Sequence, residues 1–168
     1  MEYEIIYSDR RTIALTIKEG TLIVRAPSGA KRRDIEKLIR EHSAWIEKHL
    51  AVSKRKRELY SSLGEEDIKL LKRQAREVLP KKTAYFAALM NIDYGKIRIT
   101  SARGRFGSCS SDGNISYSYR LMLYPEEAID YVVVHELAHR RQMNHSPEFY
   151  KIVASVFPDY KKRAKLLK

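Results

Sequence analysis

Residues 131–139 read YVVVHELAH, and this stretch decides how the C-terminal part of the chain is built. An apolar run leads directly into His135 and Glu136, and His139 follows four residues after the first histidine. Side chains four residues apart lie on the same face of a helix, so both imidazoles can bind one metal ion. The apolar run before them favours a buried helix at the floor of a cleft.

Glu136, next to this pair of histidines, indicates that the metal site is catalytic. Its carboxylate follows the first histidine, where it can accept a hydrogen bond from a metal-bound water. Zinc lowers the pKa of such a water to about 7, and a neighbouring carboxylate can then take its proton and deliver it to a leaving group. We therefore expect a zinc-dependent hydrolase with Glu136 as general base.

His145 is the expected third ligand, six residues after His139. The chain has five histidines, and three of them fall within residues 135–145. Asn144 tolerates the left-handed backbone conformation that ends helices, so a turn there would bring His145 back to the metal. Three protein ligands leave a fourth position open for water, as a catalytic zinc ion requires.

Glu148 stays open as an alternative third ligand. It follows Ser146 and Pro147, a pair typical of a helix N-terminus, and its other expected role is to interact with the dipole of that helix. The two remaining histidines, His42 and His49, follow the apolar stripe of an earlier helix. We expect these two to pack or to lie at the surface rather than to bind metal.

The N-terminal part predicts a small antiparallel sheet followed by a helix. Short segments rich in β-branched residues at Tyr3–Tyr7, Thr12–Ile17 and Leu22–Arg25 are separated by turn formers. Apolar residues then recur every three or four positions from Ile35 to Leu50, which is typical of a helix. The basic run Lys54–Arg57 is expected to be a solvated linker or a helix end.

The middle of the chain predicts a long helix and a hairpin. Residues 65–90 have helical periodicity, and Pro80 should kink this helix or start a second one. Residues 96–100 and 115–120 are predicted strands, separated by a Gly- and Ser-rich loop and an Asp-Gly turn. Pro125 and the two acidic residues after it start the helix that carries the metal ligands.

These elements predict an α+β chain. We expect a β-rich subdomain with a helix over residues 1–60 and a metal-binding catalytic part over residues 61–168, with the hairpin packed beside the active-site helix. One continuous domain is the alternative.

Composition adds constraints on partners and location. The chain is 43% hydrophobic, enough for a packed core, and its net charge of +12 favours anionic partners, although a solvated surface would give the same charge. Cys109 is the one cysteine, which excludes an intramolecular disulfide and fits a reducing compartment. We expect this thiol to be a small buried side chain. With no signal peptide and no apolar run of about 18–20 residues, the expected location is cytoplasmic, without membrane contact.

Several stretches resemble the YgjP-like metallopeptidase family. RFGSCS, GNIS and RL within residues 105–121 resemble the family's RWGSCSS, GNIS and RL segment, with Phe106 in place of the usual tryptophan. The family's YVVVHELAHL and MNHSPxFW segments have counterparts at residues 131–139 and 143–149, where the second usual aromatic is Tyr150 or Phe149. Shorter matches are RRTI at residues 10–13, VRAP at residues 24–27 and PDYK at residues 158–161.

The resemblance implies a zincin-like fold, related in motif to SprT-like proteases. It also implies one zinc ion held by His135, His139 and His145, with Glu136 as catalytic base. This ligand set agrees with the set reached from spacing.

The predicted hairpin supplies further candidates. Arg105 and Arg120 flank it, and either can stabilise an oxyanion or pair with a phosphate, or simply hold the loop. In zincins a strand beside the active helix binds the substrate backbone by strand addition, and Ile115, Tyr117 and Tyr119 are the candidates for such an edge. The two tyrosines are also alternates for oxyanion contact, although packing is the favoured role for both.

Four functions remain open from the sequence. The first is a zinc metallopeptidase acting on peptide or protein, and the second is a nucleotide pyrophosphohydrolase with the same metal site. The third is a DNA-associated protease, which needs Lys54–Arg57 and Lys161–Arg163 to form one basic patch. The fourth is a metal-stabilised binding domain without catalysis.

Overall fold

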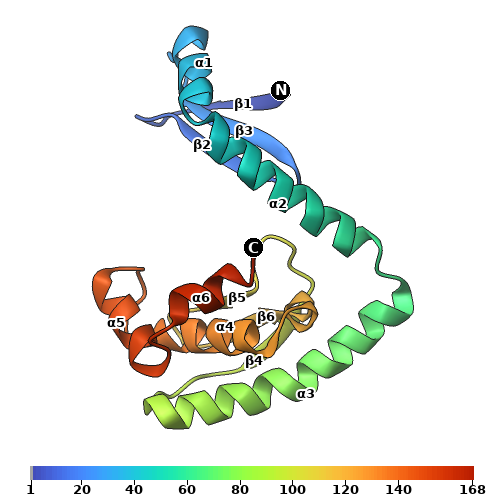
Figure 1. Ribbon diagram of the computed structural model, residues 1–168. Helices are drawn as coiled ribbons and strands as arrows, with labels where there is room; N and C mark the ends of the chain where they lie inside the picture. The colour runs from blue at the N-terminus through green and yellow to red at the C-terminus, as the bar shows by residue number, and fades with distance from the viewer. Residues whose placement is uncertain (1) are drawn as a thin grey trace. The chain divides into compact units, whose positions relative to one another are not determined.

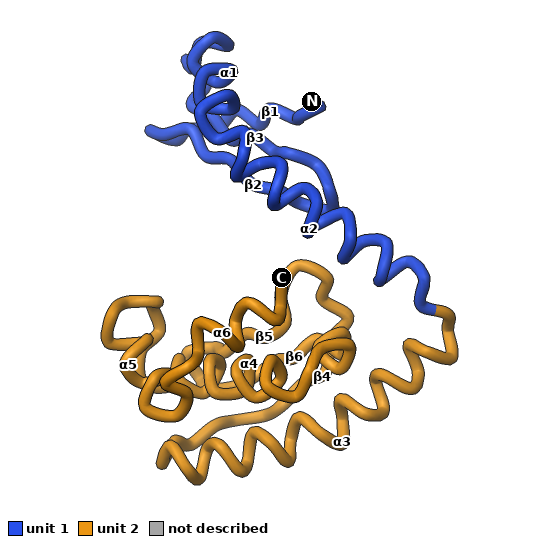
Figure 2. Tube along the Cα trace, viewed as in Figure 1, with its two compact units in different colours: residues 1–63 blue, residues 64–168 orange. Residues whose placement is uncertain are grey.

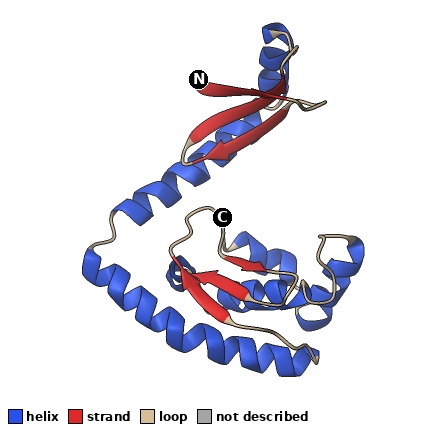
Figure 3. Cartoon of the chain, turned by 180° about the vertical axis from the view of Figure 1, so that it is seen from behind, coloured by secondary structure: helices blue, strands red, loops and turns tan. Residues whose placement is uncertain are grey.

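A computed structural model describes residues 2–168, and the chain divides into two compact units, Met1–Leu63 and Gly64–Lys168 (Figures 1 and 2). Each unit combines one three-stranded sheet with helices, as Figure 3 shows, which confirms the expected α+β class. Among the described residues, no helix has the length and apolar character needed to cross a membrane.

The sheet of the first unit is mixed rather than antiparallel. Its central strand β3 pairs antiparallel with β2 and parallel with β1, so the expectation of an antiparallel sheet is wrong for β1. Glu19 and Gly20 have positive φ values of 51° and 86°, and this tight turn sets β3 directly beside β2. β1 then pairs with the other edge of β3. The strands are β1 Tyr3–Ser8, β2 Ala14–Lys18 and β3 Thr21–Pro27.

Two helices, not one, follow this sheet. Helix α1 spans Arg32–Glu41 and helix α2 spans Ser43–Ser61, with a break at His42, where φ is −107° and ψ is 17°. The apolar stripe therefore continues across two helices. The basic run Lys54–Arg57 lies inside α2, so it is not a linker. The core of this unit is Leu22, Val24, Ala26, Ile35 and Ile46.

The second unit begins with α3, which spans Glu65–Met90 without interruption at Pro80. No second helix starts at the proline, and the helix ends where Asn91 adopts a left-handed conformation with φ 50°. Its buried positions recur every three to four residues and form one face: Leu71, Ala75, Leu79, Thr83, Phe86, Ala87 and Met90. That face packs against α4, the helix over Glu126–Ala138.

The sheet of this unit has the order β4-β6-β5, with β6 parallel to β4 and antiparallel to β5. The hairpin predicted between residues 96–100 and 115–120 is therefore wrong: the hairpin joins β5 to β6 through the turn at residues 111–114. Gly113 has φ 84° in this turn. The strands are β4 Ile97–Thr100, β5 Gly107–Cys109 and β6 Ile115–Ser118.

Helix α4, Glu126–Ala138, is the buried centre of the second unit. It contacts α3, β5, α5 and α6, which explains why its middle is apolar on every side. The 3-10 helix η1, Tyr119–Leu123, leads into it from β6, and α5, Pro147–Val156, and α6, Tyr160–Lys165, complete the unit.

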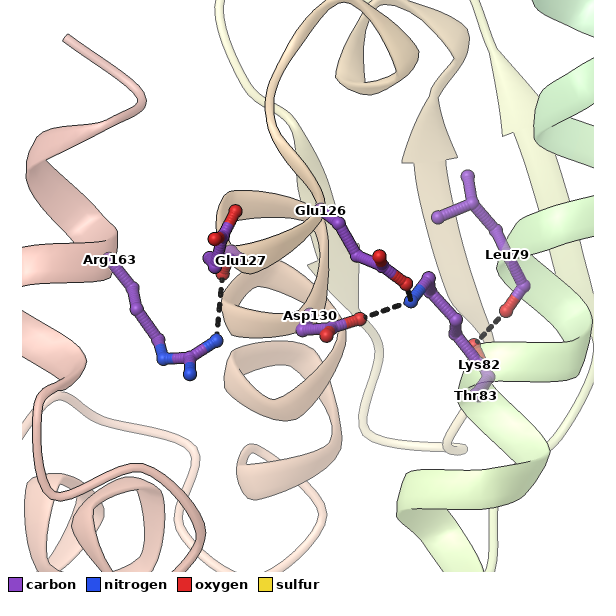
Figure 4. A network of polar contacts seen from close by, with 7 residues as sticks. All are labelled: Leu79, Lys82, Thr83, Glu126, Glu127, Asp130 and Arg163. Atoms are coloured by element: carbon purple, nitrogen blue, oxygen red, sulfur yellow. Dashed lines mark hydrogen bonds and ion pairs between the residues drawn. The ribbon is translucent and has the colours of Figure 1, made fainter.

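A lysine on α3 ties this helix to α4 (Figure 4). Lys82 Nζ lies 2.6 Å from Glu126 Oε1 and 2.6 Å from Asp130 Oδ1, and the side chains of Lys82 and Asp130 are only 19% and 18% exposed. We expect Lys82→Met to lower the free energy of unfolding of the chelator-treated chain by about 1–3 kcal/mol, because Asp130 is left largely buried without its cation. Urea denaturation followed by circular dichroism measures this change.

Lys81 is the matched control. Its ion pair with Glu77 spans 3.3 Å between side chains that are 74% and 68% exposed. Lys81→Met should therefore change stability by no more than about 0.5 kcal/mol. Equal effects of the two substitutions would show that the buried link contributes nothing beyond an exposed pair.

Candidate metal centre

Three imidazoles meet at the C-terminal end of α4. His135 and His139 come from the helix and its last turn, and His145 comes from the loop before α5. One ligand atom from each ring lies within 4.8 Å of the other two, and the Nε2 atoms of His135 and His145 are 3.0 Å apart. Two nitrogens bound to one tetrahedral zinc are about 3.3 Å apart, so the cluster has the dimensions of a zinc site.

The three imidazole rings pack against the ring of Phe149. The Phe149 side chain is fully buried, and its ring centroid lies 4.8 Å from His135, 4.6 Å from His139 and 4.8 Å from His145. His145 is exposed, so the cluster is closed on the Phe149 side and accessible on the other.

The two helical histidines are held in the neutral form that binds metal. Burial, together with the neighbouring His139 and His145, lowers the pKa of His135 to about 4. Burial also lowers the pKa of His139. At neutral pH both rings therefore keep a free lone pair, which is the form that coordinates zinc.

Each helical imidazole also has a partner on its other nitrogen. His135 Nδ1 lies 3.4 Å from the Tyr131 hydroxyl, and His139 Nδ1 lies 3.1 Å from the carbonyl oxygen of Gln142. A carbonyl can only accept, so His139 Nδ1 donates to it. The Nε2 atom of each ring is thereby left available as a candidate ligand atom.

Glu136 follows His135 on α4 and is buried, with 5% of its surface exposed. Burial raises the pKa of its carboxyl to about 8, and Arg105 acts in the opposite direction. A carboxyl with a pKa near neutrality can both take up and release a proton under physiological conditions. Arg105 is exposed and is close enough to act electrostatically on Glu136, so it stays a candidate for oxyanion contact.

Gly107 makes room for Glu136, and sequence reasoning missed it. A Cβ atom built on this glycine would lie 2.6 Å from Glu136 Cγ and 2.7 Å from its Cδ, closer than carbon atoms approach. Gly107 does not have positive φ, so the requirement is close approach and not backbone conformation. The one signal in the sequence was a glycine between Phe106 and Ser108, inside the stretch that resembles the family.

We expect Gly107→Ala to lower kcat by about 100-fold while zinc stays bound, because the added methyl group displaces Glu136 and an error of about 1 Å in a catalytic group costs that much. Steady-state kinetics together with metal analysis test this. Gly104→Ala is the control, since a Cβ there meets nothing within 4 Å. Full activity of the Gly107→Ala protein would contradict the role assigned to the glycine.

His145 reaches the cluster by a different route from the expected turn. Helix α4 already ends at Ala138, with His139 as its C-cap, and the chain turns over the next residues. Asn144 is not among the residues with positive φ, so the predicted left-handed turn there is wrong. Its side-chain Oδ1 instead accepts a hydrogen bond of 3.2 Å from the Ser146 N–H.

Glu148 lies at the N-terminus of α5 and outside the cluster of candidate ligands found in residues 2–168. It is exposed, and hydrogen bonds from its own backbone N–H and from the Ser146 hydroxyl lower the pKa of its carboxyl. Ser146 caps the helix and Pro147 is its first residue, as predicted. Glu148 therefore serves this helix end rather than the three imidazoles.

The remaining histidines lie in the first unit. His49 stacks on Trp45 with ring centroids 4.3 Å apart, and its Nδ1 lies 2.8 Å from the Trp45 carbonyl oxygen. His42 occupies the break between α1 and α2. Neither belongs to a group of candidate ligands in the described part of the chain.

Arg120 is buried and stabilises the loop between β4 and β5 through hydrogen bonds. It is 5% exposed, and its Nη1 donates hydrogen bonds of 2.6 Å to the Ser101 carbonyl and 3.4 Å to the Ala102 carbonyl. Its guanidinium also packs over the Tyr119 ring at 4.5 Å. These contacts fix the loop between β4 and β5, which was the structural alternative considered for this arginine.

The proposed edge strand is wrong. Ile115 and Tyr117 lie on β6, which is the central strand, and Tyr119 follows it in η1; all three side chains are buried. The Tyr117 hydroxyl lies 3.1 Å from Thr83 Oγ1, inside the core. Within residues 2–168, β5 pairs only with β6 and contacts α4, so β5 is the edge beside the metal cluster. Its Gly-Ser-Cys sequence has little β propensity, and the pairing was therefore missed.

Cys109 ends β5 and is partly buried. Burial, and then the negative charge of Glu136, raise the pKa of its thiol, so it stays protonated. The side chain is only partly buried, so the expectation of a buried thiol is met in part. Beside it is a polar hollow of about 370 Å³ on the surface of the second unit, lined by Arg98, Ser108, Cys109, Ser110, Asp112, Asn114 and Ser116.

Comparison with known proteins identifies the family. The family model described as "YgjP-like, metallopeptidase domain" matches residues 11–70 and 60–168, which is nearly the whole chain. The chain belongs to the YgjP-like family. Its candidate metal centre lies within the second match, and the family assignment confirms the resemblance drawn from the sequence motifs. No curated protein matches this YgjP-like chain.

Solved structures that are similar to the YgjP-like chain include two metallopeptidase zymogens. One is the metallopeptidase zymogen of Pyrococcus abyssi abylysin, with 23% identity and a TM-score of 0.49 over 52% of this chain and 90% of that one. The other is the metallopeptidase zymogen of Methanocaldococcus jannaschii jannalysin, with 21% identity and a TM-score of 0.43 over 47% and 81%. At these levels the likeness adds no functional argument.

Proposed function

We propose that this YgjP-like chain is a zinc-dependent peptidase, with one zinc ion held by His135, His139 and His145 and with Glu136 as general base. The observation that carries the proposal is the group of three imidazoles, two of them held neutral, together with the buried carboxyl of Glu136, the residue that follows His135 on α4. A bound zinc ion would lower the pKa of water to about 7 and polarise a carbonyl oxygen.

The protein's own groups supply the proton transfers. Glu136 accepts the proton of the attacking water and passes it to the leaving amine, which its raised pKa favours near neutral pH. Gly107 lets the carboxyl lie against the backbone of β5. Arg105 is the candidate for stabilising the negative charge that develops on the carbonyl oxygen.

The strand β5 supports a peptide as the substrate. It is the sheet edge that contacts α4, and an extended peptide can add to such an edge through main-chain hydrogen bonds. Because Gly107 lies in β5 and touches Glu136, a peptide bound there passes beside the general base.

A nucleoside triphosphate is the second candidate substrate. The observations that favour it are the net charge of +12 and the exposed Arg105 close to Glu136, which could pair with a phosphate. This function would use the same metal ligands and the same general base.

A substrate screen on the zinc-loaded protein tests the proposal. A mixed peptide library and a set of nucleoside triphosphates are incubated with the wild type and with Glu136→Gln as background, and metal content is measured on the same samples. We expect zinc at one ion per chain and cleavage of peptides by the wild type alone. Cleavage of nucleotides only would make the second candidate correct. Absence of zinc binding would overturn both.

A further inference from the structure

The tyrosine one helical turn before His135 contacts the metal cluster through its hydroxyl group. Tyr131 and His135 are four residues apart on α4, their ring centroids are 5.7 Å apart, and the Tyr131 hydroxyl oxygen lies 3.4 Å from His135 Nδ1. Tyr131 is buried, with 9% of its surface exposed. Packing alone would be satisfied by phenylalanine, so the position of the hydroxyl needs another explanation.

The direction of this contact follows from the geometry of His135. Its Nε2 faces the Nε2 of His145 at 3.0 Å and is therefore the atom directed into the cluster. A neutral imidazole with Nε2 bound to a metal carries its hydrogen on Nδ1. The Tyr131 oxygen lies 3.4 Å from this nitrogen, and the lone pairs of a phenol oxygen can accept its hydrogen.

We infer that Tyr131 is a positioning residue for zinc, whose hydroxyl accepts the Nδ1–H of His135 and so fixes the tautomer and the orientation of that ring. The inference rests on the proposed zinc site. The Gln142 carbonyl does the same for His139, at 3.1 Å from its Nδ1. Because that group belongs to the backbone, Tyr131 is the member of the pair that a side-chain substitution can remove.

Loss of a hydrogen-bond partner of this kind weakens metal binding by about 10–100-fold, because the ligand ring loses orientation and basicity. We therefore expect Tyr131→Phe to raise the Kd for Zn²⁺ about 10–100-fold, measured by competition with a chromophoric chelator at pH 7. The substitution keeps the ring, so the melting temperature of the chelator-treated protein should stay close to that of Tyr117→Phe.

Tyr117→Phe is the matched control for zinc affinity. Its hydroxyl is also buried and also makes one side-chain contact, 3.1 Å to Thr83, in the core of the same unit but outside the metal cluster. This variant should bind Zn²⁺ within about twofold of the wild type, since it loses a core hydrogen bond but no contact with a ligand ring.

A second readout detects the proton itself. In zinc-loaded protein labelled with ¹⁵N-histidine, the Nδ1–H of His135 should be protected from solvent exchange in the wild type and in Tyr117→Phe, and unprotected in Tyr131→Phe. A purely structural role for Tyr131 would change melting but neither this signal nor the Kd.

The outcomes separate the two proposals. Equal Kd values for the wild type and Tyr131→Phe would overturn the role of Tyr131 and leave the zinc site intact. Equal weakening by Tyr131→Phe and Tyr117→Phe would also overturn it, because the effect would then come from the core. A wild-type protein that binds no Zn²⁺ would overturn the proposed function and, with it, this inference.

Discussion

Glu136→Gln protein is expected to bind zinc as tightly as the wild type and to lose kcat by a factor of about 10²–10⁴, the usual contribution of a general base. Glutamine keeps the shape of the side chain in the tight space beside Gly107, but it cannot accept the proton of water. The metal ligands are not touched, since Glu136 is not one of the three imidazoles. Steady-state kinetics and metal analysis on the same preparation measure both quantities.

Stability of the metal-free variant shows whether it has kept its fold. Burial raises the pKa of Glu136 from 4.5 to about 8. A raised carboxyl pKa means that the folded state favours the protonated form, so this group costs stability progressively as pH rises from about 4.5 to 8. Glutamine has no such cost, and Glu136→Gln without metal should be at least as stable as the wild type at pH 7. Activity within tenfold of the wild type would reject Glu136 as the base.

His145→Ala is expected to weaken zinc binding by more than about 100-fold, since losing a hydrogen-bond partner of a ligand already costs 10–100-fold and this change removes the ligand itself. Activity should be lost with the metal. The side chain is exposed and comes from a loop, so the fold of the metal-free chain should be kept. Chelator competition gives the Kd, and thermal melting of the metal-free protein verifies folding.

Two controls distinguish the third ligand from its rivals. Glu148→Gln should leave the zinc Kd unchanged, because Glu148 lies at the start of α5 and not in the cluster. His49→Ala removes a histidine that stacks on Trp45 in the first unit, and it should also bind zinc normally. The assignment of His145 fails if its removal leaves the Kd unchanged while Glu148→Gln raises it.

Predictions from the sequence succeeded where the governing interactions are local. Helix α3 has the bounds expected from its periodicity, Ser146 and Pro147 start α5, and the two histidines four residues apart fall on one side of α4. In each case the signal and the structure involve residues within one or two helical turns. Hydrogen bonds within a helix connect neighbours along the chain, so no distant partner has to be known.

Predictions failed where the partner is distant in sequence. The strand at residues 115–118 was expected at a sheet edge beside the site, but it is the central strand, paired with β4 on one side and with β5 on the other. Likewise β1 pairs parallel to β3, although an antiparallel sheet was expected. Strand pairing depends on which segments meet in space. A segment of three residues such as Gly107–Cys109 is too short, and too low in β propensity, for the sequence to predict its pairing.

The sequence by itself determined the chemistry of the zinc-site candidate through the residue types of His135, Glu136 and His139. It also determined that the two histidines share one face of a helix, because the α-helix fixes that geometry locally. Only the tertiary structure decided how the site is completed. It places His145 next to His135 and His139, with all three rings packed against Phe149. It also places the backbone of Gly107 in contact with Glu136 and makes β5, which contains Gly107, an edge strand of the sheet. These contacts arise from packing between separate elements, and no local pattern encodes that packing.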